Sequence, residues 1–480
     1  MNQVRFFFIF LEFFVLFLLF NPLLFSFYSF SNNSYELQRV LEWILIGLSL
    51  LHLGIDQPVR QHAFAFLQGL CTYQKILLAL IFILGLISSL HAVYPAYALL
   101  EYTTFCGLFF TTLLFTGLFC LKKEGYLQCF YAFILITFGV SCVTALLMLY
   151  DMLNLPGFDK GGDMMYTILA SPGYMNRRFY DDVACMVLPI LIGLAYRKDG
   201  KKIQINWVVF MILAYMYTRG IISHSRIYLF EPLALFVLFP IFYKRKALPF
   251  LGIQFAAIIV GAALYALFYM HHGLTPGEFP GRTFLNHRYL LWSISIHLMI
   301  HHPLLGVGPL HFNLYAFPFE ISAAHPHSAV MVIGAEWGLV VLLSLGALVI
   351  TGLFGCVKNN HLVSMPLMGS LLGALMMAQV DGLILMPAGQ MMLCLILAWA
   401  FSSQSAGGTS ITQLAMSRWW VPVLFSLSIC AFGVMLWVGI PLLLNMNEIL
   451  FGFLNHCNQD CLLSPDYWSE GFIQFYSPSV

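Results

Sequence analysis

Charged residues are scarce in this sequence. They make up 9% of the 480 residues, whereas 60% of the residues are hydrophobic, and a soluble domain carries about 25% charged residues. A chain with so few charges cannot cover itself with a polar surface, so the composition excludes a soluble protein and predicts an all-α polytopic membrane protein. The formal net charge of +1 lacks the basic excess of proteins that bind nucleic acid, so we expect no nucleic-acid partner.

The sequence also lacks any Asp-x-Asp pair. Enzymes that hold a divalent ion against a pyrophosphate usually need such carboxylates. Four histidines of one predicted outer loop could bind a metal ion: His297, His301, His302 and His311. Because no acidic pair accompanies them, we expect a metal-independent protein without a cofactor.

Apolar runs of about 20 residues, the length that crosses a bilayer, are abundant. They predict about 12–13 transmembrane helices. The first run follows only Arg5 and lacks a small-residue cleavage site, so we interpret it as a retained helix rather than a signal peptide. The candidate spans are 6–30, 38–54, 75–93, 97–120, 126–150, 183–196, 204–222, 227–243, 248–270, 328–354, 362–384, 388–402 and 419–442.

Lysine-rich loops fix the predicted orientation, because cytoplasmic loops carry the excess of positive charge. Lys122-Lys123, Lys201-Lys202 and 244–246 fall on one side of the predicted helices, which we expect to be cytoplasmic. The predicted organisation is then N-terminal transmembrane helices (1–150), a periplasmic loop (151–182), central transmembrane helices (183–270), a large periplasmic loop (271–327), C-terminal transmembrane helices (328–442) and a periplasmic tail (443–480).

The predicted outer side carries seven arginines, Arg282 among them, and a single lysine, Lys160. Arginine binds phosphate through a planar fork and stays protonated, so the set indicates a cationic pocket for a phosphorylated lipid; the alternative is a set of side chains that reach from helix ends to the interface. The arginines considered for this pocket are Arg177, Arg178, Arg219, Arg226 and Arg288. Arg39 belongs to the same side, but we expect an Arg39→Lys change to be silent.

The loop 271–327 is too long to be a simple connection. Leu290, Leu291, Ile294 and Leu298 have the spacing of an amphipathic helix that lies against the membrane. Pro303 should end this helix, and 306–309 (Gly-Val-Gly-Pro) should form a tight turn.

The segment 325–328 reads His-Pro-His-Ser and precedes the apolar span 328–354. An imidazole at the membrane–water boundary can titrate near neutral pH and move protons, so His327 is the candidate catalytic base; the alternative is a histidine that caps a helix. His325 is then structural or a supporting partner, and His311 a reserve candidate. Glu336 and Asp381 are acids in apolar surroundings that could each pair with an arginine or orient a histidine.

These motifs together resemble the bacterial O-antigen ligase superfamily, which also contains O-antigen polymerases and protein O-oligosaccharyltransferases. His327-Ser328 followed by Gly338 is similar to the family's His-Asn/Ser/Gln-x9-Gly signature, although Val341 departs from its last position. The remaining similarity lies in Arg288-x3-Trp292 with the following His-Pro-Leu-Leu-Gly-Val-Gly (302–308), in Ser225-Arg226, and in Asn176-Arg177-Arg178-Phe179 before Pro189.

The resemblance implies a glycosyltransferase with GT-C-like architecture in the bacterial inner membrane, active on the periplasmic face in lipopolysaccharide biosynthesis. Its donor would be a glycan on undecaprenyl pyrophosphate, and its acceptor a sugar of lipid A–core, a growing glycan or a protein hydroxyl. The resemblance also implies that His327 is catalytic and that Arg226 and Arg288 bind pyrophosphate. Outside this superfamily, the alternative is a transporter of a lipid-linked glycan, which the gathering of arginines on one face argues against.

Overall fold

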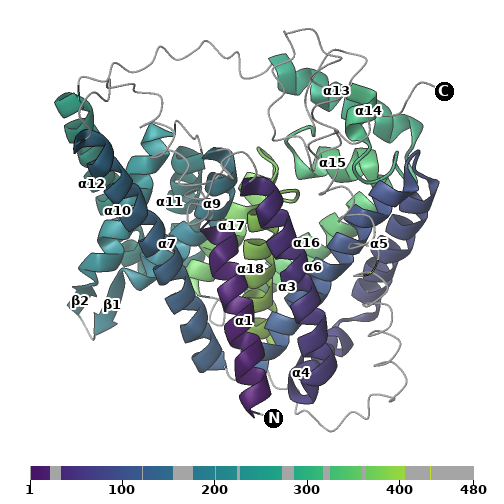
Figure 1. Ribbon diagram of the computed structural model, residues 1–480, viewed down its shortest axis with the longest axis horizontal. Coiled ribbons are helices and arrows are strands. Elements are labelled where there is room, and N and C mark those ends of the chain that lie inside the picture. The colour runs from purple at the N-terminus through teal and green to yellow at the C-terminus, as the bar shows by residue number, and fades with distance from the viewer. Residues whose placement is uncertain are drawn as a thin grey trace.

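The computed structural model describes residues 2–21, 34–121, 123–154, 177–199, 202–223, 227–272, 286–316, 325–358 and 364–405, together with Gly433. Over these residues the protein is helical apart from one antiparallel hairpin of two four-residue strands (Figure 1). The all-α polytopic fold class is therefore confirmed. The predicted spans and loops that fall wholly on other residues, such as 419–442 and the tail from 443, lie outside the described residues.

The elements follow one another in a simple order. They are α1 (Asn2–Phe20), α3 (Ser34–Ile55), α4 (Gln57–Gly69), α5 (Thr72–His91), α6 (Pro95–Leu121), α7 (Lys123–Asn154), α9 (Arg177–Leu194), β1 (Tyr196–Asp199), β2 (Lys202–Ile205), α10 (Trp207–Ile222), α11 (Ile227–Tyr243), η1 (Lys244–Ala247), α12 (Leu248–His272), α13 (Asn286–His301), α14 (Phe312–Ala316), α15 (Ala329–Glu336), α16 (Leu339–Lys358), α17 (Met365–Ala378) and α18 (Pro387–Ser405).

Seven helical segments within the described ranges are long and apolar enough to cross a membrane. They are Gln3–Phe20, Leu37–Ile55, Thr72–His91, Pro95–Leu121, Glu124–Leu147, Ile227–Leu267 and Leu339–Val357, the sixth of which contains α11 and most of α12. Three shorter apolar helices, α10, α17 and α18, complete this set. Most of the predicted spans thus correspond to helices, whereas α4 and the β1–β2 hairpin were not foreseen.

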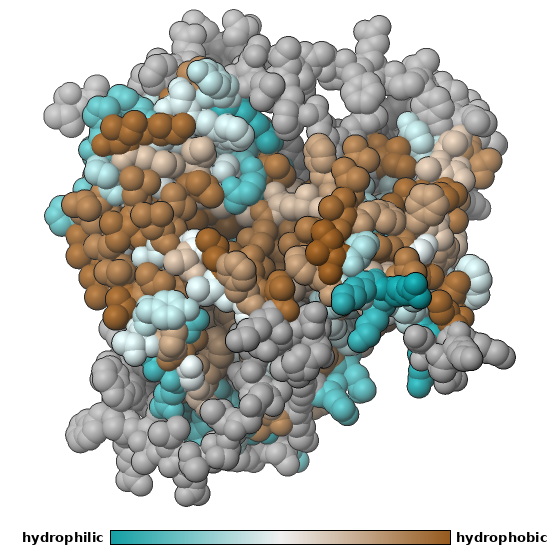
Figure 2. Space-filling view, turned by 180° about the vertical axis from the view of Figure 1, so that it is seen from behind, coloured by the Kyte–Doolittle hydropathy of each residue, from teal (hydrophilic) through white to brown (hydrophobic). Residues whose placement is uncertain are grey.

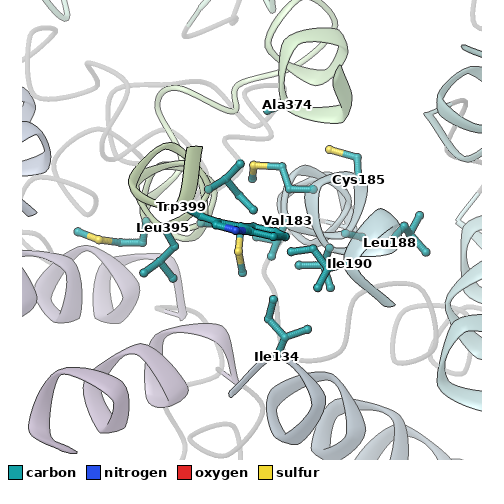
Figure 3. Close-up of a cluster of buried hydrophobic side chains, with 14 of the residues drawn as sticks. Ile134, Val183, Cys185, Leu188, Ile190, Ala374, Leu395 and Trp399 are labelled. Atoms are coloured by element: carbon teal, nitrogen blue, oxygen red, sulfur yellow. The ribbon is translucent and has the colours of Figure 1, made fainter. Parts of the chain in front are cut away.

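The core of the bundle lies where α9 packs against α17 and α18. Every described side chain from 179 to 192 of α9 is buried, including those of Asp181 and Asp182. From 183 to 192 the helix is apolar on all sides, which requires burial. Val183 of α9, Ile134 of α7 and Trp399 of α18 meet in this core (Figure 3). Pro189 lies inside α9 and packs on Gly369 of α17, where an added Cβ would lie 2.6 Å from the proline ring.

The outer surface of the bundle is apolar. Phe6, Val208 and Leu343 expose 72%, 72% and 69% of their surface, respectively, and hydrophobic residues gather across the middle of the face seen in Figure 2. Water would not tolerate so much exposed apolar surface, whereas lipid does. The bundle therefore presents to its surroundings the surface expected of a membrane protein.

A small unit of α13, α14 and α15 lies at one end of the bundle, and α4 and the β1–β2 hairpin lie at the other (Figure 1). Leu291, Ile294 and Leu298 of α13 are buried against Phe312 and Ala335 of this unit. The sequence prediction was right about the helix and its end before Pro303, but wrong about its apolar face. That face packs on α14 and α15 instead of lying on the bilayer, because two short helices supply the apolar surface that it covers.

The predicted span 328–354 is two helices. The short helix α15 ends at Glu336, and α16 begins at Leu339. Gly338 has φ +90° between them, and an added Cβ there would lie 2.4 Å from the carbonyl oxygen of Leu304. The break therefore requires glycine, both for its backbone conformation and for the close approach of the preceding turn.

Candidate active site

His327 sits in a tight turn ahead of α15. Its φ of +51° is positive, a conformation that costs a residue with a side chain about 1–3 kcal/mol and is often found at functional sites. The His327 N–H donates to Nδ1 of His325 over 3.1 Å, and the two rings are 4.2 Å apart between centroids. From α13, the indole N–H of Trp292 donates to the carbonyl oxygen of Pro326 over 3.0 Å. The turn is thus held by its own first histidine and by α13.

Asp381 brings a carboxylate to His327 from the loop between α17 and α18. Nδ1 of His327 lies 3.3 Å from Oδ1 of Asp381, and that oxygen also accepts the N–H of Gly382 over 3.0 Å. An ionised carboxylate only accepts hydrogen bonds, so with Asp381 ionised Nδ1 of His327 is the donor in this pair and Nε2 is the ring nitrogen that could act as a base. The sequence left open whether Asp381 or Glu336 orients a histidine, and the structure places Asp381 there.

A second hydrogen bond joins the same two loops. The Ser328 hydroxyl donates to the side-chain oxygen of Gln379 over 3.3 Å. The His327 side chain is 24% exposed and that of Asp381 10%, so the imidazole can meet a substrate while its carboxylate partner is largely shielded. A histidine oriented by a buried carboxylate can take a proton from a hydroxyl group.

The site also offers metal ligands. One nitrogen of His325, one nitrogen of His327 and one oxygen of Asp381 all lie within 4.8 Å of one another. Two imidazoles and a carboxylate are a donor set that suits Zn²⁺. The same three side chains could therefore serve either proton transfer or metal binding, and an experiment must separate the two.

Glu336 braces the turn that follows α13. Its two carboxylate oxygens accept the N–H groups of Leu310 and Phe312, each over 3.1 Å. Backbone bonds add to this brace, because the N–H groups of Val307 and Gly308 donate to the last carbonyl oxygens of α15, over 3.0 and 2.9 Å. Burial raises the pKa of Glu336 to about 8, against the lowering effect of the two N–H donors. The role of Glu336 in the structure is to join the turn to α15.

The turn itself depends on glycine at 306. Gly306 has φ +65°, and an added Cβ would lie 2.4 Å from the carbonyl oxygen of Glu336. The α13 block and the His327 block, separate in the sequence, are therefore in direct backbone contact.

Both ring nitrogens of His311 form hydrogen bonds in the turn that Glu336 holds. Its Nδ1–H donates to the carbonyl oxygen of Pro309 over 2.7 Å, and its Nε2 accepts the N–H of Tyr94 over 2.9 Å. Burial lowers its pKa. With its lone pair occupied by a backbone N–H, His311 is not available as the reserve base that the sequence suggested.

The arginines divide into distinct environments. Arg219 is fully buried in the bundle, where it donates to Asp181 over 2.8 Å and to the Tyr228 hydroxyl over 2.7 Å. Its guanidinium carbon lies 3.7 Å from the centre of the Tyr180 ring. Because its charge is compensated by a buried carboxylate, Arg219 is a structural ion pair rather than part of an exposed phosphate site.

Arg288 is the arginine that the structure associates with the histidines. It is half-buried on α13, one turn before Trp292, and Trp292 holds the His327 turn. Arg177 and Arg178 begin α9, but their side chains, and the whole of Arg226, lie outside the described residues. The pocket predicted from the arginine set therefore rests on Arg288 in the part of the chain that is described.

Trp292 and Gln379 contribute contacts that the sequence reading did not assign. Trp292 was part of the Arg288-x3-Trp292 motif, whose spacing puts both residues on one face of a helix, but the motif alone indicated no contact for it. Gln379 carries no comparable signal, because its role depends on the tertiary approach of the loop before α18.

Residues 207–346 match the family model described as O-antigen ligase. This stretch, less than half of the chain, is similar to the O-antigen ligase family. The match runs from α10 into α16 and includes Arg288, His327 and Gly338, so the resemblance drawn from the motifs is confirmed. Asp381 lies beyond the matched residues. No curated protein matches the chain.

Proposed function

We propose that this O-antigen ligase-type protein is a glycosyltransferase that moves a glycan from undecaprenyl pyrophosphate to an acceptor hydroxyl group on the periplasmic face of the bacterial inner membrane. The observation that carries the proposal is the His327–Asp381 pair at 3.3 Å, held against α13 at the end of the bundle opposite the β1–β2 hairpin. The lysines of that hairpin and of η1 favour a cytoplasmic location for their own end.

In this reaction Nε2 of His327 takes the proton of the acceptor hydroxyl group, and the acceptor oxygen attacks the anomeric carbon from the side opposite the pyrophosphate. The new glycosidic bond forms as the bond from the anomeric carbon to pyrophosphate breaks, so the configuration inverts. Undecaprenyl pyrophosphate leaves with the electron pair of that bond. Asp381 stabilises the imidazolium that forms, and Arg288, with Arg226 and the α9 arginines, stabilises the charge on the leaving group.

Lipid A–core is the acceptor that we propose first, because it is the acceptor of a ligase; a growing glycan and a protein hydroxyl are the alternatives within the superfamily. The purified protein in detergent should be given a defined undecaprenyl-pyrophosphate glycan with each acceptor in turn. We expect transfer by the native protein and none by His327→Ala, which should still bind the donor. Donor binding without transfer to any acceptor by the native protein would favour a transporter.

The same assay addresses the metal alternative at His325, His327 and Asp381. We propose that transfer is metal-independent, so chelation with EDTA should leave the rate unchanged. Loss of transfer with EDTA, restored by Zn²⁺, would assign the three side chains to a metal ion instead.

A further inference from the structure

Arg39 is buried at the start of α3 and contacts the segment that leads into α18. It is 5% exposed. One guanidinium nitrogen donates to the side chains of Glu42, over 2.5 Å, and Gln390, over 3.0 Å. The other terminal nitrogen donates to the carbonyl oxygen of Leu385. Arg39 therefore joins an early helix to a loop about 350 residues later in the chain, a contact that the expectation of a silent Arg39→Lys change did not include.

That loop, 379–386, is the one that presents Asp381 to His327. It folds back on itself, because the N–H of Leu385 donates to the carbonyl oxygen of Gly382 over 2.8 Å. The side-chain amide of Gln390 donates to the carbonyl oxygen of Ile384 over 2.7 Å. The carbonyl groups of the successive residues Ile384 and Leu385 thus accept hydrogen bonds from the side chains of Gln390 and Arg39, respectively.

The charge of Arg39 does not serve a phosphate. The carboxylate of Glu42 compensates it directly, and both side chains are buried. Arginine suits this position because of its shape, since its planar fork reaches a carboxylate, an amide oxygen and a backbone carbonyl group together. A lysine ammonium keeps the charge but offers a single nitrogen, which cannot span these three acceptors.

We propose that Arg39, together with Gln390, is a positioning residue that fixes the loop 379–386 so that Asp381 meets His327. The inference rests on the proposed function of the His327–Asp381 pair and adds a residue from outside the domain that matches the family. It gives the first helices of the chain a part in the reaction. A displacement of a reacting group by about 1 Å can slow an enzyme about 100-fold, so loosening this loop should reduce the rate without altering donor binding.

The test is Arg39→Lys in the transfer assay. We expect the rate at saturating donor to fall, by no more than the roughly 5- to 30-fold that loss of the Asp381 charge should cost, with the KM for donor unchanged. Arg60→Lys is the matched control, because Arg60 donates to the carbonyl oxygens of Leu53, over 2.9 Å, and Gly54 at the opposite end of α3. This control should transfer at the native rate.

A double-mutant cycle separates positioning from a general structural role. If Arg39 acts through Asp381, adding Arg39→Lys to Asp381→Asn should cost less than threefold more, since the charge of Asp381 is already absent. A full additional loss, or native transfer by Arg39→Lys alone, would overturn the inference. Should Arg39→Lys not fold, Gln390→Met removes the neighbouring contacts and carries the same expectations.

The two proposals fail differently. Native transfer by both His327→Ala and Asp381→Asn would remove the proposed function, and the inference with it. Loss of transfer in those two variants together with full activity of Arg39→Lys would remove only the inference.

Discussion

Replacing Asp381 by asparagine tests the most specific geometric claim about the site. The change keeps the shape and an oxygen that can accept from Nδ1 of His327 at 3.3 Å, but it removes the charge. A hydrogen bond to a charged group contributes about 1.5–3 kcal/mol and a neutral one about 0.5–1.5 kcal/mol, so the difference is about 1–2 kcal/mol. That corresponds to a rate about 5- to 30-fold lower. His327→Ala removes the base itself and should cost about 10²–10⁴-fold.

The measurement is the single-turnover rate of glycan transfer at saturating donor, with purified variants in the same detergent. Ser328→Ala is the matched control, because it removes a neutral hydrogen bond between the same two loops; at 3.3 Å this long bond should contribute the low end of the range, about 0.5 kcal/mol, a cost of about two- to threefold. The double variant His327→Ala/Asp381→Asn should be no slower than His327→Ala. An Asp381→Asn enzyme slower than His327→Ala would show that Asp381 is the base, and native activity of Asp381→Asn would show that the contact has no catalytic role.

Other predictions follow from the same contacts. Arg288→Lys keeps the charge but loses the fork, so transfer should fall about 10-fold or more at normal protein abundance; full activity would exclude a phosphate role. Because the folded state raises the pKa of Glu336 from 4.5 to about 8, its contribution to stability is fully present below pH 4.5 and is lost as the pH rises through 8; the thermal midpoint of Glu336→Gln should lack this decline. Gly338→Ala should destabilise the protein by about 1–3 kcal/mol, measured as a lower thermal midpoint, and an unchanged midpoint would contradict the close approach at Leu304. With Cys71, Cys129 and any other reactive native cysteine replaced, Ser293→Cys in α13 should react with an impermeant maleimide in intact spheroplasts, whereas Lys246→Cys should not; the reverse pattern would place the site in the cytoplasm.

The sequence was informative where one property of the chain decided the outcome. Apolar run length predicted most of the helices, and the histidine motif singled out His327. The break after α15 was missed because the run 328–354 is apolar along most of its length, with Glu336 as its one charged residue, and glycine at 338 is a weak signal until the turn at Leu304 is seen against it.

Tertiary contacts decided the rest. Glu336 and Asp381 look alike in the sequence, since both are acids among apolar residues. Only the folded chain shows that Glu336 accepts hydrogen bonds from backbone N–H groups, whereas Asp381 contacts His327. The contacts of Arg39 were not foreseen for the same reason. Its partners Leu385 and Gln390 are remote in the sequence, and neither helix periodicity nor charge pattern reports such a contact.

The length of the short helix α15 sets the distance between His327 and Gly338. Nine residues, 329–337, separate His327-Ser328 from Gly338, and they are the eight residues of α15 and Trp337 at its C-terminus. Each residue inserted into a helix turns what precedes it by about 100° and shifts it by about 1.5 Å. An insertion or deletion within 329–337 would therefore swing the imidazole away from the loop 379–386 while leaving the glycine break seated on Leu304. The spacing between the two ends of the signature thus fixes both the distance and the rotation of His327 relative to Gly338, through a little more than two turns of helix.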